Sequence, residues 1–299
     1  MDKSSLPEGQ AHKRIDKSYK GGSDYLMQLA EEEGWSPGLS DARILDHADP
    51  TAVTISLVNG QPVGGIAVMK HGDRSSFVGL FLVDRKWRGR GIGRALWDCA
   101  TEPLGTSLVG LDAVPELEDW YRRFGFLRDQ RTLKLSATAS SIPEISASKE
   151  TVREFGPDDL ASIVALDRLD GFAWRARYLR AWMTDGLVRT AIATSEDGMT
   201  LTGYASLRPT HSGWRLGPVR AENPQIASSL LFQIFRDTQL AQGLGATVTV
   251  HVSESNSQAC NFFENLGFEE FGETVRMYRG NLVHSLSQAT FGIMGPELG

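Results

Sequence analysis

The chain contains few cysteines and no apolar run long enough to cross a membrane. Its 299 residues include two cysteines, Cys99 and Cys260, too few for a disulfide framework or a structural zinc site. We expect two free thiols and no bound metal. No segment provides the ~20 consecutive apolar residues of a membrane-spanning helix, and Met1 to Ser5 lacks the apolar core of a signal peptide. These absences predict a cytoplasmic protein without a membrane partner.

Basic residues are also outnumbered. The chain has 31 Lys and Arg residues against 37 Asp and Glu residues, a formal net charge of −6. Acidic chains are poor candidates for general nucleic-acid binding, so we expect no nucleic-acid partner. A length of 299 residues and a hydrophobic content of 41% are typical of a protein with two globular domains of ordinary size.

A basic, glycine-rich loop between a predicted strand and a predicted helix is the most informative stretch. Val78 to Val83 are apolar or glycine, which predicts a buried strand, and the apolar residues of Ile92 to Ala100 share one helix face. The free N–H groups and the dipole at a helix N-terminus favour phosphate. Glycines allow the backbone to approach the phosphate oxygens, and Arg88, Arg90 and Arg94 add positive charge.

The spacing of this loop excludes two common phosphate-binding motifs. A P-loop needs Gly-Lys-Ser/Thr before the helix, whereas Gly93 is followed by Arg94. A dinucleotide fingerprint needs a small residue where this chain has Arg94 or Leu96. The remaining pattern is Arg-x-x-Gly-x-Gly, formed by Arg88, Gly91 and Gly93. It resembles the pyrophosphate loop of the GNAT superfamily of N-acetyltransferases, which implies acetyl-CoA as the donor substrate.

The order of predicted elements before the loop matches a GNAT domain. The spacing of apolar residues predicts a strand, two helices and three antiparallel strands, with a hairpin turn at Asn59-Gly60. The expected ranges are Lys13 to Lys20, Ser23 to Glu33, Ser40 to His47, Val53 to Leu57, Pro62 to Met69 and Phe77 to Val83.

A second motif follows the strand expected over Ser107 to Ala113. Trp120 to Phe126 resembles the second GNAT signature. In that signature an apolar residue is followed by Tyr, two polar residues, an apolar residue and Gly-Phe. The resemblance implies that Tyr121 protonates the departing thiolate. The alternative is a half-buried tyrosine with a structural hydroxyl. Leu127 to Leu135 is the expected closing strand of this half.

The second half repeats the pattern. Its Gly267-Phe268 follows Gly125-Phe126 by 142 residues, an internal repeat of domain size. We therefore predict an α/β protein with mixed sheets and two tandem GNAT domains, over residues 1–136 and 151–299, joined by a linker at 137–150. Arg220 to Pro224 replaces the glycine loop and Phe263 replaces the tyrosine, so we expect the second domain to lack a CoA site. This domain resembles the C-terminal domain of a group of bacterial tandem GNAT proteins. The expected elements are strands at 152–155, 190–194, 200–207, 214–219 and 246–252, with helices opening at Gly156, over 174–183, from Pro224 to Gln242 and over 256–265.

The resemblance also implies which residues hold the donor. Backbone groups of Leu82 and Val83 would pair with the pantetheine arm, and one N–H of that strand would polarise the thioester carbonyl. The family's strand glutamate is replaced by Gly79. The base would then be Asp112, Glu33 or a water chain, and we choose Asp112, whose alternative role is local hydrogen bonding. The loop residues expected to hold the diphosphate are Arg88, Gly89, Arg90, Gly91, Ile92, Gly93 and Arg94.

The expected activity is transfer of an acetyl group from acetyl-CoA to a primary amine of a small molecule by direct attack. Alternatives are a protein N-terminus or lysine as acceptor, or a non-catalytic acyl-CoA sensor. The carboxylates of Glu31 to Glu33, Asp41 and Asp46 would face a cationic amine or, alternatively, form a solvated helix face. We expect a monomer or a homodimer.

Overall fold

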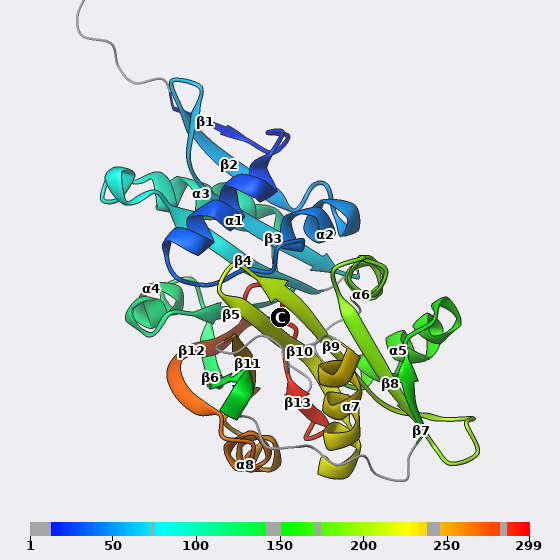
Figure 1. Cartoon of the computed structure of the whole chain (residues 1–299). Coiled ribbons are helices and arrows are strands. Elements are labelled where there is room, and N and C mark those ends of the chain that lie inside the picture. The colour runs from blue at the N-terminus through cyan, green and yellow to red at the C-terminus, as the bar shows by residue number, and fades with distance from the viewer. Residues whose placement is uncertain (1–12, 73–74, 142–150, 171–174, 238–245, 282–285) are drawn as a thin grey trace, which may run out of the picture.

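The computed structural model describes residues 13–72, 75–141, 151–170, 175–237, 246–281 and 286–299, and its strands form one continuous mixed sheet (Figure 1). We call residues 13–141 the first half and 151–299 the second half. The strands of the first half are β1 (Lys13–Asp16), β2 (Val53–Val58), β3 (Gln61–His71), β4 (Ser75–Val83), β5 (Leu108–Ala113) and β6 (Leu127–Thr138). Those of the second half are β7 (Thr151–Glu154), β8 (Arg189–Thr194), β9 (Leu201–Thr210), β10 (Gly213–Ala221), β11 (Thr247–Ser253), β12 (Glu269–Arg279) and β13 (Thr290–Gly292).

The helices lie on both faces of the sheet, and their positions follow the predicted order closely. The β2–β3 hairpin turns at Asn59 and Gly60, both with positive φ, which confirms the turn expected there. No described helix has the length and apolar character needed to span a bilayer. The helices are α1 (Gly22–Glu32), α2 (Asp41–Ala48), α3 (Ile92–Thr101), α4 (Glu118–Arg122), α5 (Leu160–Asp167), α6 (Ala176–Met183), α7 (Pro224–Asp237) and α8 (Ser257–Asn265).

The two halves exchange strands at the centre of the sheet. The order β4-β5-β12-β6-β11-β10 places β12 of the second half beside β5, and β6 of the first half beside β11 (Figure 1). The predicted strand over Leu127 to Leu135 therefore exists, but it does not pair with β5 as its place at the end of the first half suggested. It also continues to Thr138, into the predicted linker, of which residues 142–150 lie outside the described part.

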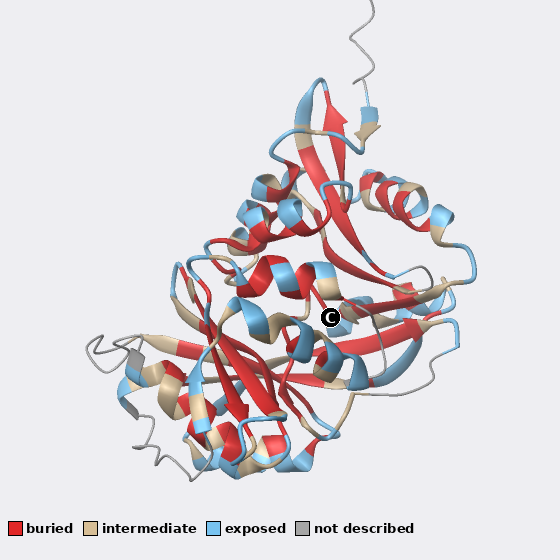
Figure 2. Ribbon diagram, turned by 90° about the vertical axis from the view of Figure 1, so that its right-hand side faces the viewer, coloured by how far each residue is buried: buried red, intermediate tan, exposed pale blue. Residues whose placement is uncertain are grey.

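The hydrophobic core is shared between the halves. One buried cluster combines α1 and α2 with α6, where Leu26 and Leu45 belong to the same core as Leu179 and Trp182. Figure 2 shows the buried residues concentrated in the strands that cross the middle of the molecule. Because both halves contribute to this cluster, the first half's helices are positioned partly by the second half.

The C-terminal segment runs through the middle of the molecule (Figure 1). Phe291, Ile293, Met294 and Leu298 are buried, and Arg175 donates a hydrogen bond to the carbonyl oxygen of Gly299. The burial of these apolar side chains fixes the last residues of the chain between the two halves.

Candidate functional site

The site begins where β4 and β5 separate. These parallel strands pair only from Ser75 to Val78, against Leu108 to Leu111. Immediately beyond, the β3–β4 register shifts and Leu80 adopts a φ of +48°, so β4 carries a bulge that bends it away from its neighbour. Beyond Val78, the backbone groups of β4 that face β5 therefore have no strand partner.

A cavity of about 580 Å³ lies at the glycine loop between β4 and α3. We call it the loop cavity. Gly89 and Gly91 both have a φ of +76°, a conformation that favours glycine, and no side chain caps the N-terminus of α3 among the described residues. The lining residues include Leu82, Val83, Arg88, Gly89, Gly91, Ile92, Gly93 and Arg94, which are eight of the nine predicted donor-binding residues.

The arginines of the loop differ in their contacts. Arg90 does not line the cavity, because its guanidinium stacks 4.8 Å from the centre of the Trp87 ring. Arg88 folds back, and its Nε donates to the Val83 carbonyl oxygen (2.9 Å) while Nη2 pairs with Glu33 (2.6 Å). Arg88 therefore braces the loop against β4 and α1.

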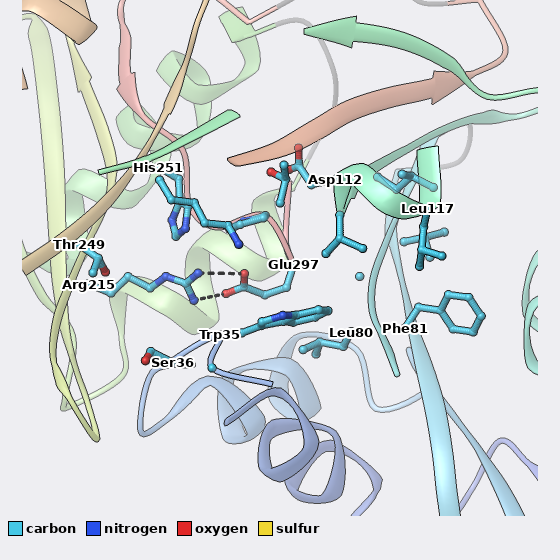
Figure 3. A pocket seen from close by; sticks show the side chains of 18 of the residues that line it. Trp35, Ser36, Leu80, Phe81, Asp112, Leu117, Arg215, Thr249, His251 and Glu297 are labelled. Carbon is cyan, nitrogen blue, oxygen red and sulfur yellow. Dashed lines mark hydrogen bonds and ion pairs between the residues drawn. The ribbon is translucent and has the colours of Figure 1, made fainter. Parts of the chain in front are cut away.

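A second cavity of about 160 Å³ adjoins the first, between the two halves of the chain (Figure 3). We call it the inner cavity. Trp35, Phe81, Val114 and Leu117 line both cavities, so the two spaces meet at these side chains. The second half contributes Arg215, Thr249, His251, Phe271, Thr274 and Glu297 to the inner wall.

Tyr121, the predicted proton donor, lines the inner cavity. It lies on α4, is 6% exposed, and packs against the rings of Trp97 and Trp120 at 5.3 and 5.0 Å between centroids. Burial raises the pKa of Tyr121 well above its ordinary value, so the phenol is protonated at neutral pH.

Asp112 also reaches the inner cavity, but its contacts oppose its predicted role as the base. Its oxygens accept hydrogen bonds from Arg276 Nη2 (2.6 Å) and Nε (3.0 Å), and from Thr132 (3.1 Å). Both side chains of the ion pair are fully buried. Asp112 is therefore the partner that holds the buried Arg276, and its role as the base stays a prediction.

The C-terminal segment occupies the place where the family carries a strand glutamate. A Cβ on Gly79 would lie 1.9 Å from the carbonyl oxygen of Glu297, so only glycine permits this approach. The Glu297 carboxylate pairs with Arg215 (2.6 and 3.3 Å; Figure 3). It also lies 3.5 Å from Arg208. Sequence reasoning missed all three charged residues. The available signals were arginines within apolar strands and the glycine at position 79.

His251 and Lys134 were not predicted either. They are cross-strand partners on β11 and β6, and both line the inner cavity. Burial, followed by the charges of Arg215 and Lys134, lowers the pKa of His251 well below its ordinary value, so this imidazole is neutral at neutral pH.

Glu33, Asp41 and Asp46 of the acidic cluster expected to face a cationic amine have partners within the protein. Glu33 pairs with Arg85 (2.9 Å) and Arg88, Asp41 pairs with the buried Arg208 (3.0 Å), and Asp46 accepts a hydrogen bond from Ser23 (2.5 Å). Asp41 is buried, so it does not belong to the solvated helix face named as the alternative, and contact of this cluster with an amine stays a prediction.

The second half contains the counterpart of this site in a closed form. β10 and β11 also pair in parallel only from Gly213 to Leu216, but β13 then fills the gap by pairing with β10, and Ile293 N–H donates to the His251 carbonyl oxygen (3.0 Å). Asn223 caps α7 through the Ile226 N–H (2.9 Å). Cys99 and Cys260 are free and partly buried, and the described residues contain no cluster suited to a metal ion.

Comparison with known proteins decides the family. Residues 50–128 and 163–292 match two family models, each described as an acetyltransferase (GNAT) domain. The chain belongs to the GNAT superfamily. It is a tandem GNAT acyltransferase, which confirms the predicted fold class and the repeat.

Relatives of full length agree with this assignment. The chain is 28% identical over 275 residues to holothin acyltransferase from Pseudoalteromonas sp. (strain SANK 73390), covering 92% of this chain and 90% of that protein. A putative acetyltransferase from Pyrococcus horikoshii shares the fold with a TM-score of 0.76 at 18% identity, covering 100% of this chain and 99% of the other. A tandem GNAT protein from the clavulanic acid biosynthesis pathway does so with a TM-score of 0.64 at 15% identity, covering 90% and 98%.

Proposed function

We propose that this acyltransferase moves an acetyl group from acetyl-CoA to a primary amine of a small molecule, by direct attack in the first half of the chain. One observation carries the proposal: an open strand separation joins the uncapped N-terminus of α3 to a cavity lined by Tyr121. This arrangement supplies an anion site at one end and a proton donor at the other.

The donor would lie along the separated part of β4. The diphosphate would accept hydrogen bonds from the amides of Ile92 and Gly93, where the helix dipole favours negative charge. The pantetheine arm would pair with backbone groups of Leu82 and Val83 and point its thioester toward the inner cavity. One N–H at the bulge near Leu80 would polarise the thioester carbonyl, a contribution of ~3–4 kcal/mol to the transition state when well aimed.

The proposed step forms an amide and releases a thiol. The neutral amine attacks the carbonyl carbon, the C–S bond breaks, and Tyr121 donates its proton to the thiolate sulfur. The proton lost by the amine returns to the phenolate, directly or through water, so one amine and one thioester give one amide and free CoA. The carboxylates of Asp112 and Glu297 are held by arginines, so neither is assigned as the base.

A small molecule is favoured over a protein as the acceptor because the second half covers the inner cavity. A protein N-terminus or lysine would need an open groove beside α1 and α2, but Gly38 and Leu39, which precede α2, bond to β9 of the second half. The relative named holothin acyltransferase supports acyl transfer, and the presence of Tyr121 favours an enzyme over a non-catalytic acyl-CoA sensor.

Calorimetry with acetyl-CoA tests the donor site. In Gly91→Glu, a carboxylate at the N-terminus of α3 repels the diphosphate, and we expect binding to weaken at least ~100-fold. Gly198→Glu is the matched control, because Gly198 has a similar φ of +71°, a Cβ there also meets no atom within 4 Å, and it lies in the distant β8–β9 connection. Equal affinities in both variants would exclude the loop as the donor site.

Release of CoA thiol, measured with and without amines, tests catalysis. An enzyme releases thiol faster when a suitable amine is present, whereas a sensor releases none above the rate of spontaneous hydrolysis. Failure of a broad panel of primary amines to accelerate release from bound acetyl-CoA would favour the sensor.

A further inference from the structure

Lys134 occupies an unusual position in the wall of the inner cavity. It lies on the exchanged strand β6, between His251 on β11 and Gly272 on β12. A Cβ on Gly272 would lie 3.7 Å from the Lys134 Cδ, an ordinary van der Waals contact, so the lysine stem runs beside this position of β12. The side chain thus runs along the sheet surface beside the cavity.

No described carboxylate forms an ion pair with Lys134, although the charges of Glu297, Asp112 and Glu116 act on it from nearby. The two carboxylates that line the inner cavity are held by arginines: Asp112 by Arg276, and Glu297 by Arg215. The backbone of Lys134 belongs to the ladders with β11 and β12, but its ammonium group forms no hydrogen bond or ion pair with the described residues. Burial, followed by the charge of Arg215, lowers its pKa, as expected where positive charge is in excess. When Arg276, the partner of Asp112, is counted with the lining residues, three cations stand against two carboxylates, an excess of one positive charge.

The donor does not account for this charge. The phosphate groups would lie in the loop cavity, which is lined by Arg88 and Arg94, whereas Lys134 lines only the inner cavity. Tyr121 also lines only the inner cavity, which would hold the reacting end of the donor. The spare positive charge therefore faces the space left for the acceptor.

The mouth of the inner cavity is apolar. Phe271 lies at a bulge of β12, where the register with β6 shifts between Glu270 and Gly272, and it is 57% exposed. Leu117 beside the cavity is 40% exposed, and Trp35 adds an aromatic wall (Figure 3). Bulges next to active sites commonly re-aim a side chain, and here the bulge presents a large ring at a binding cavity.

We propose that Lys134 determines acceptor specificity: the acceptor is a primary amine with an apolar, ring-containing body and one anionic group that pairs with Lys134. This inference rests on the proposed function, whose acceptor it specifies. It differs from the expectation that Glu33 and Asp41 face a cationic amine, because both carboxylates are already paired with arginines.

A binding experiment separates this inference from catalysis. The probes are 4-methylbenzoate and 4-methylbenzamide, which have the same shape, differ in charge and cannot be acetylated. Calorimetry on the CoA-saturated protein should give at least ~10-fold tighter binding of the benzoate, because a charge-assisted hydrogen bond replaces a neutral one. In Lys134→Gln the two affinities should become equal, and Lys134→Arg should restore part of the difference. Lys70→Gln, an exposed lysine on β3, should retain the preference.

A turnover experiment then applies the same comparison to reactive amines. The ratio of kcat/KM for 4-(aminomethyl)benzoate over 4-(aminomethyl)benzamide should fall at least ~10-fold from wild type to Lys134→Gln, mainly through KM. Equal binding of the two non-reactive probes to wild type, absence of binding, or an unchanged preference in Lys134→Gln would overturn the inference. If the benzoate preference is present but no amine is acetylated, the inference about the anion site stands and the proposed function fails.

Discussion

The two halves of the molecule contain the same strand separation, in an open and a filled form. In each half, four residue pairs join the parallel strands before they diverge, after Val78 in the first half and after Leu216 in the second. The first separation opens into the loop and inner cavities, whereas β13 fills the second. The proposed donor site therefore belongs to the half in which the chain itself leaves the strand separation open.

The helices that follow the two separations differ in how their N-termini are capped. α3 begins after Gly91 without a side-chain cap among the described residues, so its first amides can bind a ligand. α7 begins with Asn223 accepting from Ile226 N–H, which satisfies one of those amides internally. Tyr121 of the first half is matched by Phe263 in the second, which has no hydroxyl to donate a proton. Three separate features thus confine the proposed chemistry to the first half.

The C-terminal segment connects the closed site to the open one. A Cβ on Gly217 would lie 2.2 Å from the Ile293 carbonyl oxygen, and a Cβ on the equivalent Gly79 would lie 1.9 Å from that of Glu297. The same segment therefore passes both bulges. In the second half it fills the separation, and in the first it builds one wall of the inner cavity and holds Arg215.

The largest effect should come from the phenol that only the first half carries. We expect Tyr121→Phe to lower kcat by ~10²–10⁴, because general acid catalysis contributes a factor of this size. Packing should be preserved, since Phe263 fills the equivalent position. Steady-state thiol release with a reactive amine measures kcat. Tyr19→Phe, a partly buried tyrosine of the same half, should retain full turnover, and wild-type turnover in Tyr121→Phe would limit Tyr121 to a structural role.

The next effect concerns the ion pair that joins β5 to the exchanged strand β12. Asp112→Asn leaves Arg276 as an uncompensated buried charge between β5 and β12, and we expect the free energy of unfolding to fall by about 3–5 kcal/mol. Urea denaturation measures it. The double variant Asp112→Leu, Arg276→Met should recover most of this loss. If Asp112→Asn were as stable as wild type, the ion pair would not contribute to the pairing of β5 with β12.

The contact between Gly79 and the C-terminal segment should give a smaller effect. Gly79→Ala places a methyl group against the Glu297 carbonyl, and we expect a loss of about 1–3 kcal/mol of unfolding free energy, typical of overpacking. In a chain that ends at residue 295 the same substitution should cost much less. Gly186→Ala, where a Cβ meets no atom within 4 Å, is the control. If Gly79→Ala lowered the free energy of unfolding equally in the full chain and in the shortened chain, the effect would arise within β4 and not from the C-terminal segment.

The smallest effect is the pH dependence from one buried histidine in each half. Burial, followed by the charge of Arg175, lowers the pKa of His71 to about 3, and burial followed by Arg215 lowers that of His251 well below its ordinary value. Between these values and about 6.5, the unfolded chain binds a proton that the folded chain does not. The stabilisation is therefore complete above about pH 6.5 and is lost as the pH falls.

Each histidine should contribute roughly 1 kcal/mol per pH unit to the decline in unfolding free energy below that pH. Urea denaturation between about pH 7 and pH 5 should show a shallower decline in His71→Asn and in His251→Asn than in wild type. A decline of unchanged slope in either variant would show that the histidine concerned is already protonated in the folded state, or that it does not titrate in this range.

Local patterns predicted most of the fold. The Asn59-Gly60 turn, the glycine loop and the strand before it depend on neighbouring residues, so the sequence carries them directly. The strand exchange depends on pairing between residues far apart in the chain, and β6 has no local feature that selects β11 and β12 over β5. The division into domains at residues 136 and 151 stays a prediction, because the exchanged strands cross it.

The site was predictable to the same extent. Tyr121 and eight of the nine expected donor-binding residues line the cavities, because the motifs that contain them are local. The ion pair of Asp112 could not be predicted, because its partner Arg276 is 164 residues away in the chain. Glu297, Arg215 and Lys134 belong to strands and a segment that meet only in the folded molecule, so no spacing in the sequence connects them.

The stoichiometry of acetyl-CoA binding tests the difference between the halves most directly. Native mass spectrometry of the full chain at saturating acetyl-CoA should detect one bound molecule per chain in wild type and none in Gly91→Glu. Two molecules per wild-type chain, or one molecule retained by Gly91→Glu, would contradict the assignment of a single donor site to the first half.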